Sequence, residues 1–295
     1  MFGEFPDEFG DDLYSFQPLW SAHENKSLVL LADSPKQSVM FYMALDDYPL
    51  VYQTDLMDTD EMLELKPDHE SYRTAEGYFG TYYVRVRPSY DLADLFREGS
   101  YSYYLRAFGQ PAGYGQTDLY HDMEVAGIAS AGNNAFYRHY ITDAEHIIRV
   151  KLFRLAGKGL PMLMVKLTSN REIMTSAVRL SYDQKIELNE DVWSVEISMD
   201  KQWRASEGHP DCDYASYWQD GGSDDCVLYM AVECQESEEM CGFKISLTLE
   251  TVSETTGEVE PISLTPARYI PKDQDYVDAV VPFRDISRFY YPIKP

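Results

Sequence analysis

The sequence predicts an all-β protein: two tandem antiparallel β-sandwiches resembling jelly rolls, followed by an extended C-terminal segment. Three observations support this prediction. Apolar and polar residues alternate in many short windows, and no window carries the long apolar stripe of a helix. Aromatic residues form 14% of the chain, including 24 Tyr, and such side chains favour strands. The length of 295 residues is enough for two domains, each with its own core.

The first sandwich is expected over residues 25–109, after an acidic arm at residues 1–24. A short helical turn is expected at residues 91–98. The linker follows at residues 110–116, where Pro111, Gly113 and Gly115 break regular structure. The predicted strands are residues 28–32, 39–45, 50–54, 62–65, 80–86 and 101–108.

The second sandwich is expected over residues 117–252. Each predicted sandwich ends with a Tyr-containing strand, a polar turn and an alternating strand, which indicates two related units. Residues 253–295 are interpreted as a polar linker and a strand segment. The predicted strands of the second sandwich are residues 123–128, 136–141, 146–153, 162–167, 177–180, 193–199, 227–232 and 243–249.

Three alternating strands are each followed, at nearly the same distance, by a Phe-Tyr pair. A nearly fixed spacing indicates repeated units. The third copy begins close to the end of the sequence, so its apolar face needs cover from elsewhere. The copies are residues 28–30 with Phe41-Tyr42, residues 123–125 with Phe136-Tyr137, and residues 277–279 with Phe289-Tyr290.

This C-terminal segment is the candidate assembly strand. It could be donated to a neighbouring chain as an added strand and so join subunits head to tail. It could equally fold back on its own second sandwich. The candidate residues are Val277, Ala279, Val281, Phe283, Phe289, Tyr290 and Tyr291.

The net charge of −25 excludes whole classes of partner. It argues against nucleic acid, because no basic surface is available to displace phosphate counterions. It also disfavours anionic membranes, and no apolar run is long enough to span a bilayer. The N-terminus lacks the pattern of a signal peptide, which by itself indicates the cytosol.

The four cysteines point to a different compartment. Cys234 and Cys241 flank a polar turn between two alternating strands, so a hairpin would bring them together as a disulfide. Cys212 and Cys226 would then close the acidic loop before it. The alternatives are a zinc site, which these spacings do not favour, and buried thiols. Disulfides imply an extracellular or cell-surface protein whose leader is removed or not included.

Two further candidate sites are a calcium site, suggested by clustered carboxylates, and a glycosylation site, which requires that the chain is secreted. The acidic loop carries Asp211, Asp213, Asp224 and Asp225, whose carboxylates could form an oxygen cage for Ca²⁺. A solvated loop explains them as well. Asn25, in the triplet Asn-Lys-Ser, is a glycosylation acceptor if the chain is secreted.

The order of strands resembles a known domain family. The segments Gly-Thr-Tyr-Tyr-Val-Arg-Val at residues 80–86 and Tyr-Ser-Tyr-Tyr-Leu at residues 101–105 are similar to the pre-peptidase C-terminal domain. Residues 228–232 and 241–245 resemble its cysteine-bearing form. The resemblance implies a jelly-roll-like sandwich of secreted proteins that binds substrate, calcium or neighbouring domains without catalysing a reaction.

No catalytic motif is present in the sequence. A Gly-x-Ser-x-Gly elbow, a His-Glu-x-x-His motif and a P-loop are all missing, so we expect no enzyme. The leading hypothesis is an extracellular structural protein that polymerises into a fibre or surface layer. The alternatives are an accessory Ca²⁺- or substrate-binding module of a secreted peptidase or glycan-acting enzyme, and a subunit of a large intracellular assembly. The expected partners are copies of itself or neighbouring β-sandwich domains.

Overall fold

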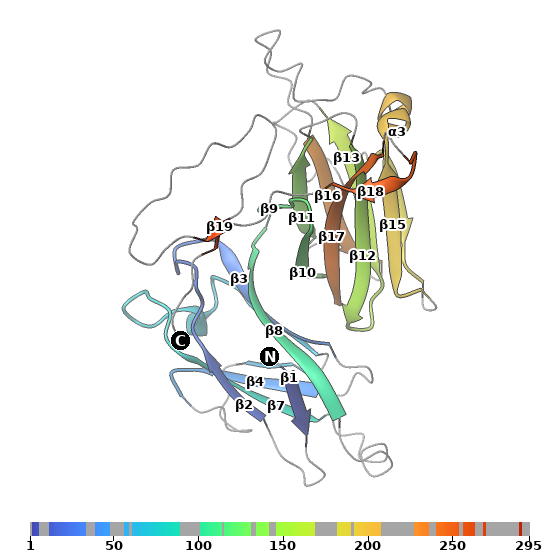
Figure 1. The fold of residues 1–295 in the computed structure, drawn as a ribbon. Helices are drawn as coiled ribbons and strands as arrows, with labels where there is room; N and C mark the ends of the chain where they lie inside the picture. The colour runs from blue at the N-terminus through green and yellow to red at the C-terminus, as the bar shows by residue number, and fades with distance from the viewer. Residues whose placement is uncertain are drawn as a thin grey trace.

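Nearly all the regular structure in the described part of the chain is β-strand, and the strands form two sandwiches (Figure 1). The structure is a computed structural model. It confirms the predicted all-β fold class with two tandem sandwiches. It describes residues 2–5, 12–33, 39–47, 56–58, 61–88, 101–113, 115–130, 134–141, 146–168, 182–189, 192–207, 227–235, 240–253, 256–262, 268–269 and 289–290.

The first sandwich has two four-stranded antiparallel sheets. One sheet has the strand order β1-β8-β3-β6, and the other has the order β2-β7-β4-β5. A 3₁₀ turn, η1 (Glu70–Tyr72), lies between β6 and β7. The strands are β1 (Phe2–Phe5), β2 (Asp12–Phe16), β3 (Lys26–Asp33), β4 (Val39–Leu45), β5 (Leu56–Asp58), β6 (Met62–Leu65), β7 (Tyr82–Pro88) and β8 (Tyr101–Pro111).

The second sandwich has two five-stranded sheets. One has the order β10-β17-β12-β15, with β18 beside β17, and the other has the order β14-β13-β16-β11-β9. A short helix, α3 (Lys201–Ser206), follows β15. The strands are β9 (Gln116–Asp118), β10 (Met123–Ala129), β11 (Ala135–Tyr140), β12 (Ile147–Ala156), β13 (Pro161–Thr168), β14 (Gln184–Glu187), β15 (Ser194–Met199), β16 (Val227–Cys234), β17 (Cys241–Val252) and β18 (Val259–Pro261).

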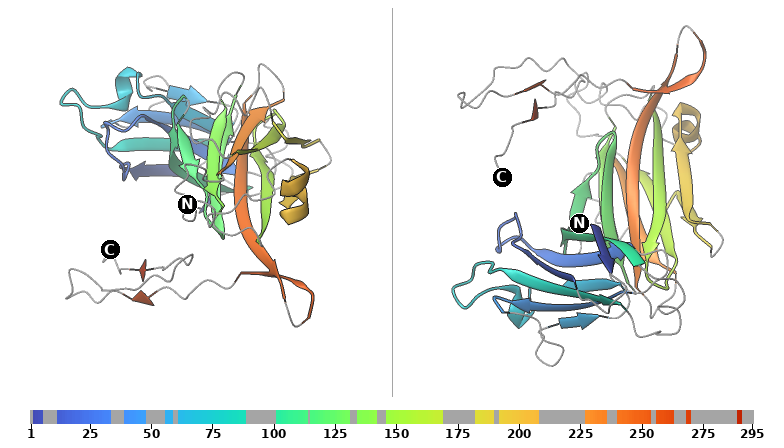
Figure 2. Two further views of the ribbon diagram at one scale, coloured as in Figure 1. Left: turned by 90° about the horizontal axis from the view of Figure 1, so that it is seen from above. Right: turned by 60° about the horizontal axis from the view of Figure 1, so that its bottom comes forward.

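Both sandwiches have the same eight-stranded topology. Counted from β1 in the first and β10 in the second, one sheet has the order 1-8-3-6 and the facing sheet has 2-7-4-5. This order is the double Greek key of a jelly roll. The two sandwiches lie against each other, as Figure 2 shows from two directions.

The N-terminal residues belong to the first jelly roll, which corrects the predicted arm at residues 1–24. Strand β1 pairs with β8, and β2 pairs with β7, so these segments supply the first two strands of the sandwich. Strand β2 is half-buried at the edge of its sheet, and its alternation is too polar to stand out in the sequence. The predicted linker at residues 110–116 is also shorter, because β8 ends at Pro111 and β9 begins at Gln116.

The Phe-Tyr copies do not occupy equivalent places. Phe41 and Tyr42 lie on β4, the fourth strand of its jelly roll, whereas Phe136 and Tyr137 lie on β11, the second strand of its own. The orientation of the two pairs differs as well. In the first pair the Phe, Phe41, faces the core of its sandwich, whereas in the second pair the Tyr, Tyr137, faces the core of its sandwich. The equal spacing therefore joins strands three and four in the first sandwich but strands one and two in the second, so it does not mark a repeated unit. In the third copy, residues 277–279 lie outside the described residues.

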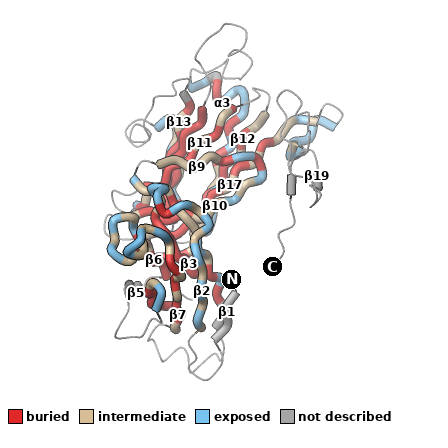
Figure 3. Tube along the Cα trace, turned by 90° about the vertical axis from the view of Figure 1, so that its left-hand side faces the viewer, coloured by how far each residue is buried: buried red, intermediate tan, exposed pale blue. Residues whose placement is uncertain are grey.

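Each sandwich has its core between its two sheets. Figure 3 shows buried positions along strands such as β3, β11 and β13 and exposed ones in many of the connections. In β17 the apolar residues alternate as predicted. Those that face the second core are Cys241, Phe243, Ile245, Leu247 and Leu249.

The buried tyrosines of the first sandwich have hydrogen-bond partners for their hydroxyls. The hydroxyl of Tyr82 donates to the carbonyl of Tyr72 at 2.6 Å. The hydroxyl of Tyr103 on β8 donates to a carboxylate oxygen of Asp12 on β2 at 2.6 Å, which links the two sheets. Burial is the main cause that raises the pKa of Tyr103, and the neighbouring Asp12 and Tyr14 raise it further. Satisfied hydroxyls allow these large side chains to be buried at little cost.

The described C-terminal residues, within 253–295, divide into two parts: β18 joins the second sandwich beside β17, and the two short strands after it pair with each other. Strands β19 (Arg268–Tyr269) and β20 (Phe289–Tyr290) form a parallel pair, and within the described residues neither strand joins a sheet of the sandwiches.

Candidate functional site

The junction between the two sandwiches is the most distinctive site in the described part of the chain. It is a small apolar cluster to which both sandwiches contribute: Val29, Leu31 and Met62 from the first, and Ile128 and Ala156 from the second. All five are almost fully buried. The cluster therefore fixes one sandwich against the other by burial of apolar surface.

Strand β3 explains how the first sandwich reaches this junction. Leu28 and Leu30 point into its own core, while Val29 and Leu31, on the opposite face, point into the junction. The unbroken apolar run at residues 28–32 was the signal in the sequence, because a strand buried on both faces does not alternate. The sequence predicted the strand, but its burial on both faces was not predicted.

Glycine makes the close approach possible on the other side. A Cβ atom added at Gly242 would lie 2.6 Å from Leu31 Cδ1 and 3.0 Å from Met62 Sδ. The first distance is shorter than real contacts reach and the second is tighter than most, so a side chain here would force Leu31 and Met62 to move. Glycine therefore favours the close approach of this strand to the first sandwich.

A buried amide adds a polar contact to the same junction. The side chain of Gln110 donates to the carbonyl of Ile128 at 2.9 Å and accepts from its N–H at 2.9 Å. Both residues are buried. Gln110 thus satisfies both backbone groups of a strand in the other sandwich, which fixes the register of the contact. A single Gln gives no signal in the sequence.

A groove opens beside this contact, where β8 and β10 approach each other. It has a volume of about 610 Å³ and is lined by residues 105–109 of β8, residues 124–126 of β10 and Lys244 of β17. The ammonium of Lys244 binds both carboxylate oxygens of Glu124 at 3.1 Å, and Arg106 pairs with Asp33 at 3.4 Å. The charges at the groove are therefore balanced, although the chain as a whole is strongly acidic.

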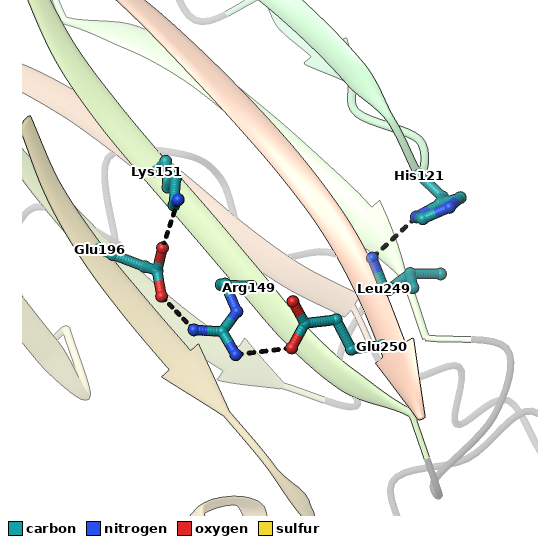
Figure 4. A network of polar contacts seen from close by, with 6 residues as sticks. All are labelled: His121, Arg149, Lys151, Glu196, Leu249 and Glu250. Atoms are coloured by element: carbon teal, nitrogen blue, oxygen red, sulfur yellow. Dashed lines mark hydrogen bonds and ion pairs between the residues drawn. The ribbon is translucent and has the colours of Figure 1, made fainter. Parts of the chain in front are cut away.

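An ionic ladder crosses the outer face of the second sandwich (Figure 4). Arg149 on β12 binds Glu196 on β15 and Glu250 on β17, the latter at 2.6 Å, and Lys151 binds Glu196 at 3.0 Å. The hydrogen bonds to Glu250 and Glu196 raise the pKa of Arg149. Burial alone would raise the pKa of Glu196, but the bonds from Arg149 and Lys151 outweigh it and lower this pKa. These ion pairs connect the three neighbouring strands β12, β15 and β17.

His121 anchors the chain that leads into the C-terminal segment. Its Nδ1 accepts from the N–H of Leu249 at 2.8 Å (Figure 4), and its Nε2 lies 3.2 Å from the carbonyl oxygen of Ile262. The first bond requires an unprotonated Nδ1, so Nε2 carries the proton and donates to Ile262. His139 is also buried and contacts the carbonyl of Leu119 at 2.9 Å; burial lowers its pKa to about 4. Both histidines have structural partners.

The cysteines do not form the predicted hairpin. Strands β16 and β17 lie in different sheets, so Cys234 and Cys241 are not opposite each other in a ladder. Both are buried thiols with no disulfide between them, which corrects the predicted bridge for this pair. Their side chains are in hydrogen-bond contact, which together with burial raises the pKa of Cys241.

Most other predicted site residues lie outside the described part of the chain. These are Asp211, Asp213, Asp224 and Asp225 of the calcium loop, Cys212 and Cys226, and Val277, Ala279, Val281, Phe283 and Tyr291 of the assembly strand. Phe289 and Tyr290 form β20. Asn25 is exposed just before β3, so it is accessible to a glycan.

Two kinds of feature are missing from the described residues. No three His, Cys, Asp or Glu side chains come close enough together there to hold a metal ion. None of the helices described there has the length and apolar character needed to cross a membrane.

Comparison with known proteins identifies no family. No family model matches the chain, and no curated protein is similar to it. The resemblance to the pre-peptidase C-terminal domain therefore stays a prediction. Among solved structures, a chain in the cryo-EM structure of broad bean stain virus shows 7% identity and a TM-score of 0.25, over 81% of this chain and 88% of that one. A TM-score this low does not establish a relationship.

Proposed function

We propose that this chain is a non-enzymatic structural subunit that assembles with copies of itself into a shell, layer or fibre. The observation that carries the proposal is the pair of complete jelly rolls joined by an apolar junction. Jelly rolls recur in the shells of viral capsids as well as in lectins, so the fold supports this function by analogy.

The junction supports the proposal on physical grounds. A subunit of a regular assembly has to present its contact surfaces at a fixed relative angle. Buried Leu31 and Met62 against Gly242, together with the two bonds from Gln110 to Ile128, hold the two sandwiches in one arrangement. A pair of binding modules on a loose linker would not need such a contact.

Charge sets the conditions under which the subunits should assemble. Each copy carries a net charge of −25, so copies repel one another at low ionic strength. Salt shortens the range of this repulsion from about 10 Å at 0.1 M to about 3 Å at 1 M. We therefore expect assembly to increase with salt or with divalent cations.

Electron microscopy of the purified full chain tests the proposal. Samples at 0.1 M and 1 M salt, over a hundredfold range of protein concentration, should show regular particles at high salt and high concentration. Irregular aggregates alone, or monomers under every condition, would argue against it.

Binding of glycans or peptides by a chain that stays monomeric would support the alternative, an accessory module of a secreted enzyme. Calorimetry with Ca²⁺ and a glycan panel measures this directly. Binding with affinities in the micromolar range and no assembly would replace the structural proposal.

The compartment can be decided separately. The side chains of Cys234 and Cys241 are in contact, so the state of this pair reports the compartment: two thiols indicate a reducing one and a disulfide an oxidising one. Mass spectrometry of the native chain after alkylation, with and without reductant, distinguishes them. Four alkylated cysteines without reductant indicate a reducing compartment, and none indicates two disulfides.

A further inference from the structure

Strand β10 has an open edge beside the groove. The N–H and C=O of Ile128 both bind the side chain of Gln110, so they point away from β17. Backbone groups alternate sides along an antiparallel strand, so those of Ala126 and Glu124 point the same way as those of Ile128. Within the described residues, β17 is the only strand that pairs with β10. The backbone groups of Ala126 and Glu124 therefore face the groove.

Strand β8 borders the groove from the other side. Its first four residues pair with β1, but residues 106–109 have β3 as their only neighbouring strand in the described part of the chain. Val125, Ala126 and Phe108 supply apolar surface between the two strands. Backbone edges and apolar side chains are the surfaces to which an extended polypeptide binds as an added strand.

The contact with Gln110 shows that this edge accepts an amide. The Gln110 side chain presents one N–H donor and one C=O acceptor to Ile128, as a residue of a neighbouring strand would. An added strand would make the same pair of bonds to Ala126 and to Glu124. It would continue, along β10, a pattern that the structure already contains at one position.

We propose that the edge of β10 binds residues 277–281 of a second copy of this chain as an added strand. This inference rests on the proposed function, because it names the contact through which the copies join. Residues 277–281 alternate Val277, Ala279 and Val281 on one face, which matches the apolar surface of the groove. Pro282 then ends the strand, because it has no N–H to donate.

Length, charge and topology agree with this occupant. Five extended residues span about 17 Å, close to the length of β10 from Met123 to Ile128. The balanced ion pairs at the groove remove the repulsion that an acidic segment meets elsewhere on the surface. Within the described residues, β10 pairs with β17 alone, and β19 and β20 pair only with each other.

The first test changes the edge in the full chain. Ala126→Pro removes the N–H that points into the groove, while the ladder to β17 uses the alternate residues and stays intact. Ala126→Val adds bulk at the same position but keeps the N–H, and it is the matched control. Circular dichroism checks that both variants fold. We expect Ala126→Pro to lower assembly at least tenfold and Ala126→Val to leave it near the wild-type level.

The second test leaves the protein unchanged and uses a labelled peptide of residues 273–284. Fluorescence anisotropy should show saturable binding to the full-length chain and weakening by at least tenfold for the Ala126→Pro chain. A peptide carrying both Ala279→Pro and Val280→Pro loses donors on both sides of the strand and should not bind. A scrambled peptide is the composition control.

The outcomes separate the inference from the proposed function. Assembly of the Ala126→Pro chain at the wild-type level overturns the inference and leaves self-assembly standing. Peptide binding to a wild-type chain that never assembles supports the edge site and overturns the proposed function. A peptide that binds the wild-type and Ala126→Pro chains equally, or that does not bind the wild-type chain, refutes the edge site.

Discussion

Replacing Gln110 by Leu should loosen the junction between the sandwiches without changing either fold. Leu has a similar size, so the main loss is polar: the N–H and C=O of Ile128 lose their partners at 2.9 Å. Both Gln110 and Ile128 are buried, so water does not readily replace the amide. The perturbation is thus confined to two hydrogen bonds.

The expected cost follows from what is left behind. Each lost hydrogen bond removes about 1 kcal/mol, and each buried backbone group without a partner adds about 1–3 kcal/mol in unfavourable cases. Partial relaxation and the apolar gain of Leu offset part of this sum. We expect the free energy of unfolding to fall by about 3 kcal/mol.

A Gln110→Glu variant tests the same contact through pH. A protonated carboxyl donates and accepts like the amide, whereas the carboxylate accepts from the Ile128 N–H but repels its C=O. Burial raises the pKa of such a carboxyl above its unfolded value of about 4.3. Its contribution to stability is therefore present below that unfolded value and is lost as pH rises through the folded pKa.

Denaturant unfolding followed by tryptophan fluorescence measures both variants against the wild type at each pH. The deficit of Gln110→Glu should be about 3 kcal/mol at pH 7 and below about 1 kcal/mol near pH 4. A Gln110→Leu chain within 0.5 kcal/mol of the wild type (about the limit of such measurements), or a Gln110→Glu deficit that does not shrink as pH falls, would refute the reasoning.

Three further predictions concern the junction, a buried histidine and the ionic ladder. Leu31→Ala should lower the free energy of unfolding by about 3 kcal/mol and split calorimetric unfolding into two transitions. Leu30→Ala, which changes the first core alone, should lower it as much without uncoupling the sandwiches. Equal calorimetric profiles for the two variants would contradict the role of the junction. Burial lowers the pKa of His139 to about 4, so the free energy of unfolding should fall by about 3 kcal/mol as pH drops from about 6.5 to 4. His139→Gln should lose most of that pH dependence. An unchanged pH profile would count against a buried, neutral His139. Arg149→Met should cost about 1 kcal/mol in urea at low salt and less at 1 M salt, and a cost independent of salt would exclude an ionic origin.

The sequence predicted strands well where apolar residues alternated strongly or formed an unbroken run. The predicted strand at residues 39–45, an unbroken apolar run, coincides with β4, and the alternating core residues of β17 face inward as expected. It missed β2, whose pattern is polar because the strand lies at a sheet edge, and it missed α3, which is only six residues long. Short and edge elements owe their structure to tertiary contacts that local patterns do not reveal.

The candidate site was harder to predict, because it depends on which strands become neighbours. Cys234 and Cys241 are close in the sequence, and a hairpin was the simplest interpretation. The chain crosses between sheets at that turn instead, as the last connection of a jelly roll does. The junction joins β3 to β10 and β17, and no spacing in the sequence relates residues so far apart. The strand at residues 28–32 is apolar on both faces, which indicated burial on both sides, but the strand at residues 39–45 has the same character, so the pattern did not locate the junction.

Sedimentation velocity of the full-length chain at 0.1 M and 1 M salt tests most directly whether it is an assembling subunit. We expect a monomer near 34 kDa at low salt and concentration, and discrete, much faster sedimenting species as salt and concentration rise. A single monomeric boundary under every condition would contradict it.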